Sequence, residues 1–139
     1  MIAFETQVRV RYGETDRMGY VYYGKYAEYF EVGRAELVRH LGIPYKYVED
    51  RGILMPVAEL DIRYKRPAYY DDLLTIRTSV PELPRSSFPT AYEIRNEAGE
   101  LIVTGFVRLA FIDKARMAPV RVPAFVLDAI LPHWPVPQP

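Results

Sequence analysis

The 139-residue sequence contains no cysteine, which excludes disulfides, thiolate metal sites and cysteine nucleophiles. It has no net charge, because 18 acidic residues balance 18 basic ones, and so lacks the basic excess typical of bulk nucleic-acid binding. No apolar run approaches the roughly 20 residues of a membrane span. Residues 1–7 lack the features of a secretion signal, so we expect a cytoplasmic protein.

Several enzyme signatures are also missing. The sequence has no G-x-S-x-G element of α/β-hydrolases and no glycine-rich fingerprint for phosphate or dinucleotide binding. Its two histidines are His40, near the end of a predicted helix, and His133, close to the C-terminal end. Neither position suggests a ligand, so we predict no metal and no cofactor.

What is present fits one folded domain over residues 1–139. Half of the residues are hydrophobic, and a chain of this length can bury a core without disulfides or metal. Twelve prolines are expected at the ends and edges of elements, and residues 132–139 form a proline-rich tail that we expect to be loosely ordered.

One long amphipathic helix is predicted over residues 25–41. Apolar or small residues recur there at spacings of three and four, and charged residues occupy other positions. Gly42 and Pro44 follow the pattern and predict the end of the helix. The positions expected to face the core are Tyr26, Phe30, Gly33, Leu37 and Leu41.

The remaining pattern has the period of two that is typical of half-buried strands. Strands are predicted over residues 4–12, 57–66, 73–80, 88–95 and 101–112. Pro89 indicates an edge or a bulge, residues 96–99 indicate a hairpin turn, and a short helix is predicted over residues 123–131.

These elements predict an α+β fold. A five-stranded antiparallel sheet with a single long helix is most economically arranged with the sheet wrapped around the helix. The outer face and the edges of such a sheet need cover or partners. We therefore predict a homo-oligomer, most simply a two-fold dimer.

The loop over residues 13–24, between the first strand and the helix, is the most informative segment. It carries a lone acid, Asp16, flanked by glycines, Met18 and aromatic residues. In a partly apolar site this carboxylate could act as a base on water or as a nucleophile. Taken alone, the pattern is more typical of an aspartate that forms a turn or caps a helix.

The predicted start of the helix has no Ser, Thr, Asp or Asn that could cap it. The first N–H groups of a helix have no intrahelical acceptor and carry partial positive charge. Left open, they could hold an oxygen that becomes negative during a reaction. Equally, Gly24 itself could cap the helix, with water on the remaining N–H groups.

These residues resemble the 4-hydroxybenzoyl-CoA thioesterase-like branch of the hot dog superfamily. The resemblance covers nearly the whole chain, and its strand, helix and strands follow in the family's order. It implies a hot dog fold, hydrolysis of acyl-CoA thioesters to free acid and CoA, and a homodimer or homotetramer. The residues that carry it are Tyr12, Glu14 to Asp16, Met18-Gly19, Val21 to Gly24, Tyr26, Glu31, Arg34, Glu36, Tyr64 to Ala68 and Asp71-Asp72.

The resemblance also implies roles for single residues. It makes Asp16 the catalytic carboxylate, as nucleophile or general base, and sets the N–H groups near Tyr22, Tyr23 and Gly24 at the thioester carbonyl. Tyr23 departs from several branches, which have a histidine there. Sites in this superfamily usually lie between subunits, so residues of both protomers are expected to contribute. The candidates for binding the CoA phosphates are Lys65, Arg66 and Lys114.

Two other functions remain open at this stage. The chain could be a non-catalytic hot dog module that binds acyl-CoA or a partner, with Asp16 in a structural role. It could also be a dehydratase or hydratase, a class that usually needs a histidine as its acid–base partner. The fold alone does not decide among these functions.

Overall fold

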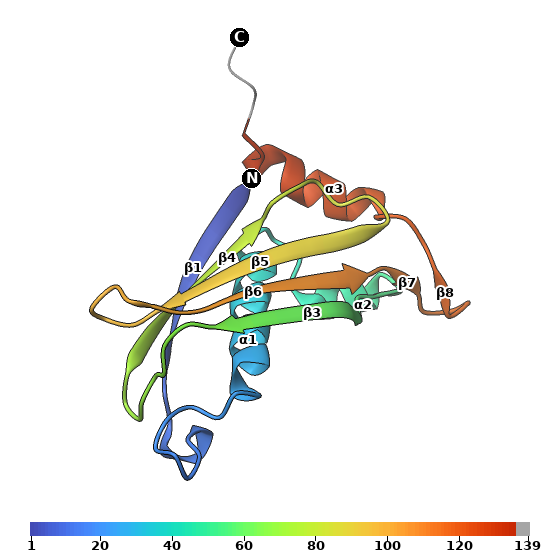
Figure 1. Ribbon diagram of the computed structural model, residues 1–139. Coiled ribbons are helices and arrows are strands. Elements are labelled where there is room, and N and C mark those ends of the chain that lie inside the picture. The colour runs from blue at the N-terminus through green and yellow to red at the C-terminus, as the bar shows by residue number, and fades with distance from the viewer. Residues whose placement is uncertain (136–139) are drawn as a thin grey trace.

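The structure, a computed structural model, describes residues 1–135. Its elements follow the predicted order of a strand, a long helix and four further strands, with several short elements added (Figure 1). None of the helices it describes is long and apolar enough to cross a membrane. In chain order the elements are β1 (Ile2–Arg9), η1 (Tyr12–Glu14), α1 (Lys25–His40), α2 (Tyr45–Asp50), β2 (Ile53–Leu54), β3 (Val57–Tyr64), β4 (Leu73–Val80), β5 (Ser87–Arg95), β6 (Leu101–Ala110), β7 (Ile112–Asp113), β8 (Ala118–Pro119), α3 (Ala124–Ile130) and η2 (Leu131–His133).

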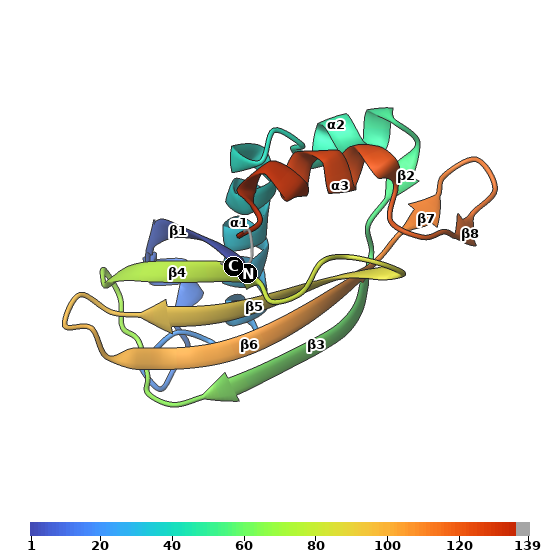
Figure 2. The same cartoon turned by 90° about the horizontal axis from the view of Figure 1, so that it is seen from above.

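The main sheet is antiparallel and has the strand order β1-β4-β5-β6-β3. Viewed from above, it is curved, and α1, α2 and α3 lie on the same side of it (Figure 2). The predicted five-stranded sheet with one long helix is therefore confirmed. The hairpin over residues 96–99 is also confirmed, since the Gly99 N–H donates to Asn96 O and Gly99 has a φ of +80°.

Three predicted strands end earlier than expected, and one of them, β3, stops at Tyr64 rather than at residue 66. The first ends at Arg9, because the chain turns into η1 at Tyr12. The last is interrupted at Phe111, after which β7 leaves the main sheet and pairs with β2 and β8. The alternation of apolar residues continues up to Phe111, one residue beyond the end of β6, so the sequence pattern does not reveal the change of partner.

The long helix α1 buries the predicted face, including Phe30, Gly33 and Leu37. It ends in a Schellman motif, in which Gly42 has a φ of +85° and its N–H donates to Arg39 O. The Ile43 N–H completes the motif by donating to Val38 O at 2.9 Å. The chain's own residues therefore define the end of the helix.

The short helix α2 was not predicted, because six residues with one buried side chain show no clear period. It is held to α1 and to the sheet by a buried arginine. The Arg34 guanidinium donates from Nε to the Tyr45 hydroxyl at 2.8 Å and from Nη1 to the Tyr92 hydroxyl at 3.2 Å. Two phenol oxygens thus receive hydrogen bonds from this largely buried charge.

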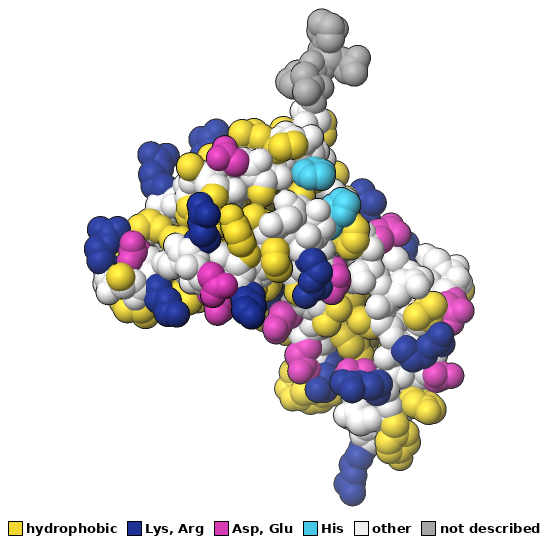
Figure 3. Space-filling model, turned by 180° about the vertical axis from the view of Figure 1, so that it is seen from behind, with side chains coloured by type: hydrophobic (Ala, Val, Ile, Leu, Met, Phe, Trp, Pro, Cys, Tyr) yellow, Lys and Arg dark blue, Asp and Glu magenta, His cyan; other side chains and the backbone are white. Residues whose placement is uncertain are grey.

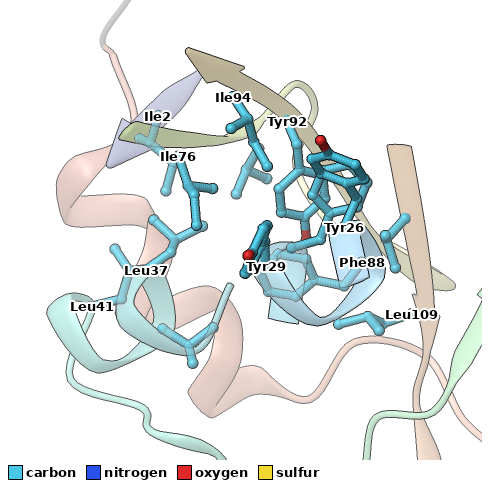
Figure 4. Close-up of a cluster of buried hydrophobic side chains, with 14 of the residues drawn as sticks. Ile2, Tyr26, Tyr29, Leu37, Leu41, Ile76, Phe88, Tyr92, Ile94 and Leu109 are labelled. Atoms are coloured by element: carbon cyan, nitrogen blue, oxygen red, sulfur yellow. The ribbon is translucent and has the colours of Figure 1, made fainter. Parts of the chain in front are cut away.

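The core lies between α1 and the concave face of the sheet, where Leu37 of α1 lies near Ile76 of β4 (Figure 4). Phe30 is fully buried and stacks on Tyr92, with ring centroids 4.3 Å apart. A Cβ on Gly105 of β6 would lie 2.2 Å from the Phe30 ring. The absence of a side chain at Gly105 therefore makes room for this ring.

Pro89, which was predicted to mark an edge or a bulge, lies at neither. It lies in β5, the central strand of the sheet. However, β4 pairs only with residues 91–95 of β5, so Pro89 is paired with β6 alone. A proline without an N–H is tolerated where one side of a strand is unpaired.

The edge strand β3 shows a difference from its sequence pattern. Its alternation is that of a half-buried strand, yet Leu60 and Tyr64 are 47% and 51% exposed. The reason is that α1 lies mainly against β1 and β4, which are at the opposite edge of the sheet from β3. An apolar strip on β3 is thus left uncovered in the single chain.

The predicted C-terminal helix is confirmed as α3. The first residues of the predicted tail are ordered, because Pro132 and His133 belong to η2 and Trp134 packs partly buried against the core. Residues 136–139 of that tail lie outside the described residues.

Candidate active site

The loop between β1 and α1 folds back on itself at Asp16. The Asp16 N–H donates to Tyr20 O at 2.9 Å, and the Gly19 N–H donates to Asp16 O at 3.0 Å, with a φ of +87° at Gly19. The carboxylate accepts the Met18 N–H on Oδ1 at 2.8 Å. Asp16 therefore forms a turn, as the local residue pattern taken alone predicts. Its other oxygen, Oδ2, has no hydrogen-bond partner within residues 1–135.

A second acid, Glu14, anchors this loop. Its Oε1 accepts the Arg11 N–H at 2.8 Å and the Tyr29 hydroxyl at 3.0 Å. Burial, with the Glu14 charge in addition, raises the pKa of Tyr29, which keeps this phenol protonated as a donor. Glu14 thus ties the loop to the end of β1 and to α1. The resemblance included Glu14 but gave it no role, and no local pattern reveals a contact with a helix residue so far along the chain.

The start of α1 has no side-chain cap, as predicted. The Tyr22 N–H, expected at the substrate carbonyl, is already used, because it donates to Glu14 O at 2.9 Å. The Lys25 N–H donates to Tyr22 O, also at 2.9 Å. Within the part of the chain that the structure describes, the N–H groups of Tyr23 and Gly24 have no acceptor. Two adjacent donors are therefore open at this point.

Gly24 leaves room for a neighbouring ring, and its backbone conformation does not require a glycine. Its φ of −70° is one that any residue adopts. A Cβ at this position would lie 2.7 Å from the Tyr22 ring. The ring therefore packs directly over the first turn of α1.

A cavity of about 390 Å³ opens beside this loop. It brings together Asp16, Tyr23, Lys65 and Arg66 from the predicted site, whereas Tyr22 and Gly24 do not line it. Lys114 also lies elsewhere, between β7 and β8 at the opposite end of β3 (Figure 1). The full lining is Asp16, Met18, Tyr20, Val21, Tyr23, Tyr26, Tyr64, Lys65, Arg66 and Pro67.

Two tyrosines of the cavity, Tyr26 and Tyr64, are neutral hydrogen-bonding groups near neutral pH. Burial raises the pKa of Tyr26 to about 12, and burial together with the neighbouring Tyr23 phenol raises the pKa of Tyr64. The two cations at the rim differ. Arg66 is paired with Glu100 at 3.2 Å, whereas Lys65 has no ion pair within residues 1–135. Lys65 is therefore the cation that is free to meet an anionic ligand.

The two histidines lie away from this loop. His40 stacks on Phe4 at a centroid distance of 4.6 Å, and its ring is 5.5 Å from that of His133. Figure 3 shows both imidazoles side by side near the end of the molecule that carries η2. Among residues 1–135 there is no group of three or more His, Cys, Asp or Glu side chains that could hold a metal ion.

Comparison with known proteins assigns the family. Residues 10–130 match the pattern of the thioesterase-like superfamily. The chain belongs to this superfamily. This thioesterase is 33% identical over 128 residues to the acyl-CoA thioesterase YbgC of Haemophilus influenzae. The aligned region covers 91% of this chain and 93% of that protein.

Solved structures agree with this assignment. The thioesterase superposes on the DHNA-CoA thioesterase of Staphylococcus aureus with a TM-score of 0.83 and 39% identity, over 87% of this chain and 81% of that one. It also matches an aspartate-to-asparagine mutant of 4-hydroxybenzoyl CoA thioesterase complexed with 4-hydroxybenzoyl CoA. Here the TM-score is 0.81 at 25% identity, over 91% and 97% of the two chains. The predicted hot dog fold and thioesterase class are confirmed.

Proposed function

We propose that this thioesterase hydrolyses acyl-CoA thioesters to a free acid and CoA, with Asp16 as its catalytic carboxylate. One observation carries the proposal: Asp16 lines the same cavity as Tyr23, and within residues 1–135 its Oδ2 and the Tyr23 N–H have no hydrogen-bond partner. Relatives named for acyl-CoA and aryl-CoA thioester hydrolysis support it.

The proposed reaction begins with the thioester carbonyl at the start of α1. Asp16 either attacks the carbonyl carbon to form an anhydride, which water then hydrolyses, or takes a proton from a water that attacks directly. In both routes the negative oxygen of the tetrahedral species accepts hydrogen bonds from the open N–H groups of Tyr23 and Gly24. The C–S bond breaks, and the CoA thiolate leaves.

The cations have unequal parts in this proposal. Lys65, which has no ion pair within the described residues, is the preferred group for a CoA phosphate. Arg66 is already partly neutralised by Glu100. Because Lys114 lies at the other end of β3, it enters the proposal only as a residue of a partner subunit.

The experiment is a panel of short, long and aromatic acyl-CoAs, in which release of free thiol is followed. We expect release with at least one class of acyl group. If a folded protein binds CoA esters without releasing thiol, it is a binding module. Water addition to an unsaturated acyl-CoA would instead indicate a hydratase, although both histidines lie away from the cavity.

Cytoplasmic location stays a prediction.

We further propose that β3 pairs with β3 of a second copy about a two-fold axis. The strand is an unpaired edge, and Val57, Leu60 and Tyr64 on it are 53%, 47% and 51% exposed. Tyr64 also lines the cavity, so a partner on β3 would lie next to the site. A homotetramer would need a second interface in addition.

Leu60→Glu should therefore convert the dimer into monomers and reduce activity, because it places a charge on the uncovered apolar strip. Native mass spectrometry and thiol release measure the two effects. The matched control is Gln7→Glu on β1, the other edge strand, which should leave both unchanged. A fully active monomeric wild-type protein would be incompatible with this interface.

A further inference from the structure

The end of β3 is hydrogen-bonded to the start of α1 by Tyr64. Its hydroxyl donates to Tyr23 O at 3.2 Å, across 41 residues of sequence. The Tyr64 ring also meets the Tyr26 ring edge-on, with centroids 5.7 Å apart. Both rings line the cavity that contains Asp16. A phenol is therefore held over the peptide group that precedes α1.

We propose that Tyr64 is a positioning residue, which orients the Tyr23–Gly24 peptide so that the Gly24 N–H can stabilise the oxyanion. This role rests on the proposed thioesterase function. The carbonyl oxygen of Tyr23 and the N–H of Gly24 belong to one planar trans peptide unit, and they point in opposite directions. A hydrogen bond that fixes the oxygen therefore also fixes the direction of the N–H.

The preceding peptide does not need such a contact. Its oxygen, Tyr22 O, accepts the Lys25 N–H at 2.9 Å, so the backbone itself orients the Tyr23 N–H. Among the described residues, the recorded hydrogen bond to Tyr23 O comes from the Tyr64 side chain. Of the two open N–H groups, only that of Gly24 thus depends for its orientation on a distant element, the strand β3.

Gly24 makes this dependence stronger. A glycine has wide backbone freedom, so the peptide before it can rotate at low cost unless something holds it. A larger residue could supply the stiffness only if the Tyr22 ring moved, because its Cβ would lie 2.7 Å from that ring. The helix start also has no side-chain cap. Tyr64 supplies the constraint that the local chain lacks.

The same hydrogen bond strengthens the donor. A hydrogen bond to a peptide oxygen polarises the whole unit, which strengthens the bond made by its N–H by about 10–30%. Tyr64 can donate throughout the neutral range, because burial and the neighbouring Tyr23 phenol raise its pKa above the ordinary value. Orientation and polarisation act on the same N–H.

Tyr64→Phe tests the assignment, because it removes the hydroxyl and keeps the ring in the cavity. With the best substrate of the acyl-CoA panel, kcat should fall about tenfold while KM changes less than about twofold. This loss is smaller than the roughly 100- to 1000-fold effect of removing an oxyanion donor outright, since Tyr64 acts through the peptide. Tyr70→Phe is the matched control, an exposed tyrosine outside the cavity lining that should leave kcat and KM unchanged.

A spectroscopic measurement separates positioning from general damage. The probe is an acyl-CoA ketone analogue, with CH₂ in place of the thioester sulfur and a ¹³C-labelled carbonyl, which the enzyme cannot hydrolyse. When it binds to wild-type protein, the carbonyl stretch should shift to lower frequency than in water. In Tyr64→Phe the stretch should move back toward the value in water, whereas Tyr70→Phe should behave as wild type.

Three results would overturn the assignment in an active enzyme. A rise in KM with kcat unchanged would make Tyr64 a contact of the acyl group. Unchanged kinetics and carbonyl frequency would remove any role for its hydroxyl. Loss of activity together with loss of the dimer would mean that its hydroxyl acts through the β3 interface and not through the Tyr23–Gly24 peptide. A wild-type protein that releases no thiol from any acyl-CoA would overturn the proposed function itself, and this role with it.

Discussion

Replacing Asp16 by asparagine is expected to lower kcat for thioester hydrolysis by roughly 100- to 10,000-fold, the range found for general acid–base groups. Asparagine keeps an Oδ1 that can accept the Met18 N–H, so the 2.8 Å hydrogen bond that closes the turn is retained. It lacks the negative charge needed to attack a carbonyl or to take a proton from water. Thiol release measures kcat, and thermal unfolding of the same samples reports on the fold.

Asp16→Ala provides the comparison that separates chemistry from structure. It removes both the charge and the turn contact, so it should lose activity and also some stability, whereas Asp16→Asn should lose activity only. Asp128→Asn on the exposed side of α3 is the control for the loss of one negative charge. If Asp16→Asn turns over normally, Asp16 is a turn former alone. If Asp16→Asn instead loses activity, rapid-quench mass spectrometry of the wild type distinguishes a nucleophile from a base, because only a nucleophile carries the acyl group.

The second large effect concerns stability. Gly105→Ala should destabilise the fold by about 1–3 kcal/mol, because its methyl group would overlap a ring that is packed on all sides. Phe30 has no exposed surface and stacks on Tyr92, so it cannot move away. Urea unfolding at one fixed protein concentration measures the change, since an oligomer's stability depends on concentration.

A double-mutant cycle makes this prediction specific. Phe30→Leu replaces the ring that a methyl group at residue 105 would overlap with a smaller side chain. The double variant should therefore be more stable than the sum of the two single effects predicts. The expected coupling is about 0.5–3 kcal/mol. Gly13→Ala is the control, since a Cβ there meets no atom within 4 Å, and it should stay within about 0.5 kcal/mol of wild type. Additive effects would mean that Phe30 and Gly105 do not constrain each other.

The sequence by itself determined the elements whose signals are local. Helix α1 follows from apolar residues at spacings of three and four and from Gly42, which lie within a few turns of one another. The strand β4 and the turn at residues 96–99 follow in the same way. Asp16 was also singled out from the sequence, because the family pattern around it is continuous along the chain, and its catalytic role stays a prediction. Side-chain period and turn chemistry act between near neighbours, so they can be read without the fold.

The tertiary structure decided everything that depends on residues far apart in the chain. It showed that β7 leaves the main sheet, that β3 keeps an uncovered apolar strip, and that Lys114 lies far from the cavity. It also decided which N–H groups stay open, because Glu14 O takes that of Tyr22. The contact of Tyr64 with Tyr23 spans 41 residues. Such contacts arise when packed elements meet, and no local preference encodes which residues will meet.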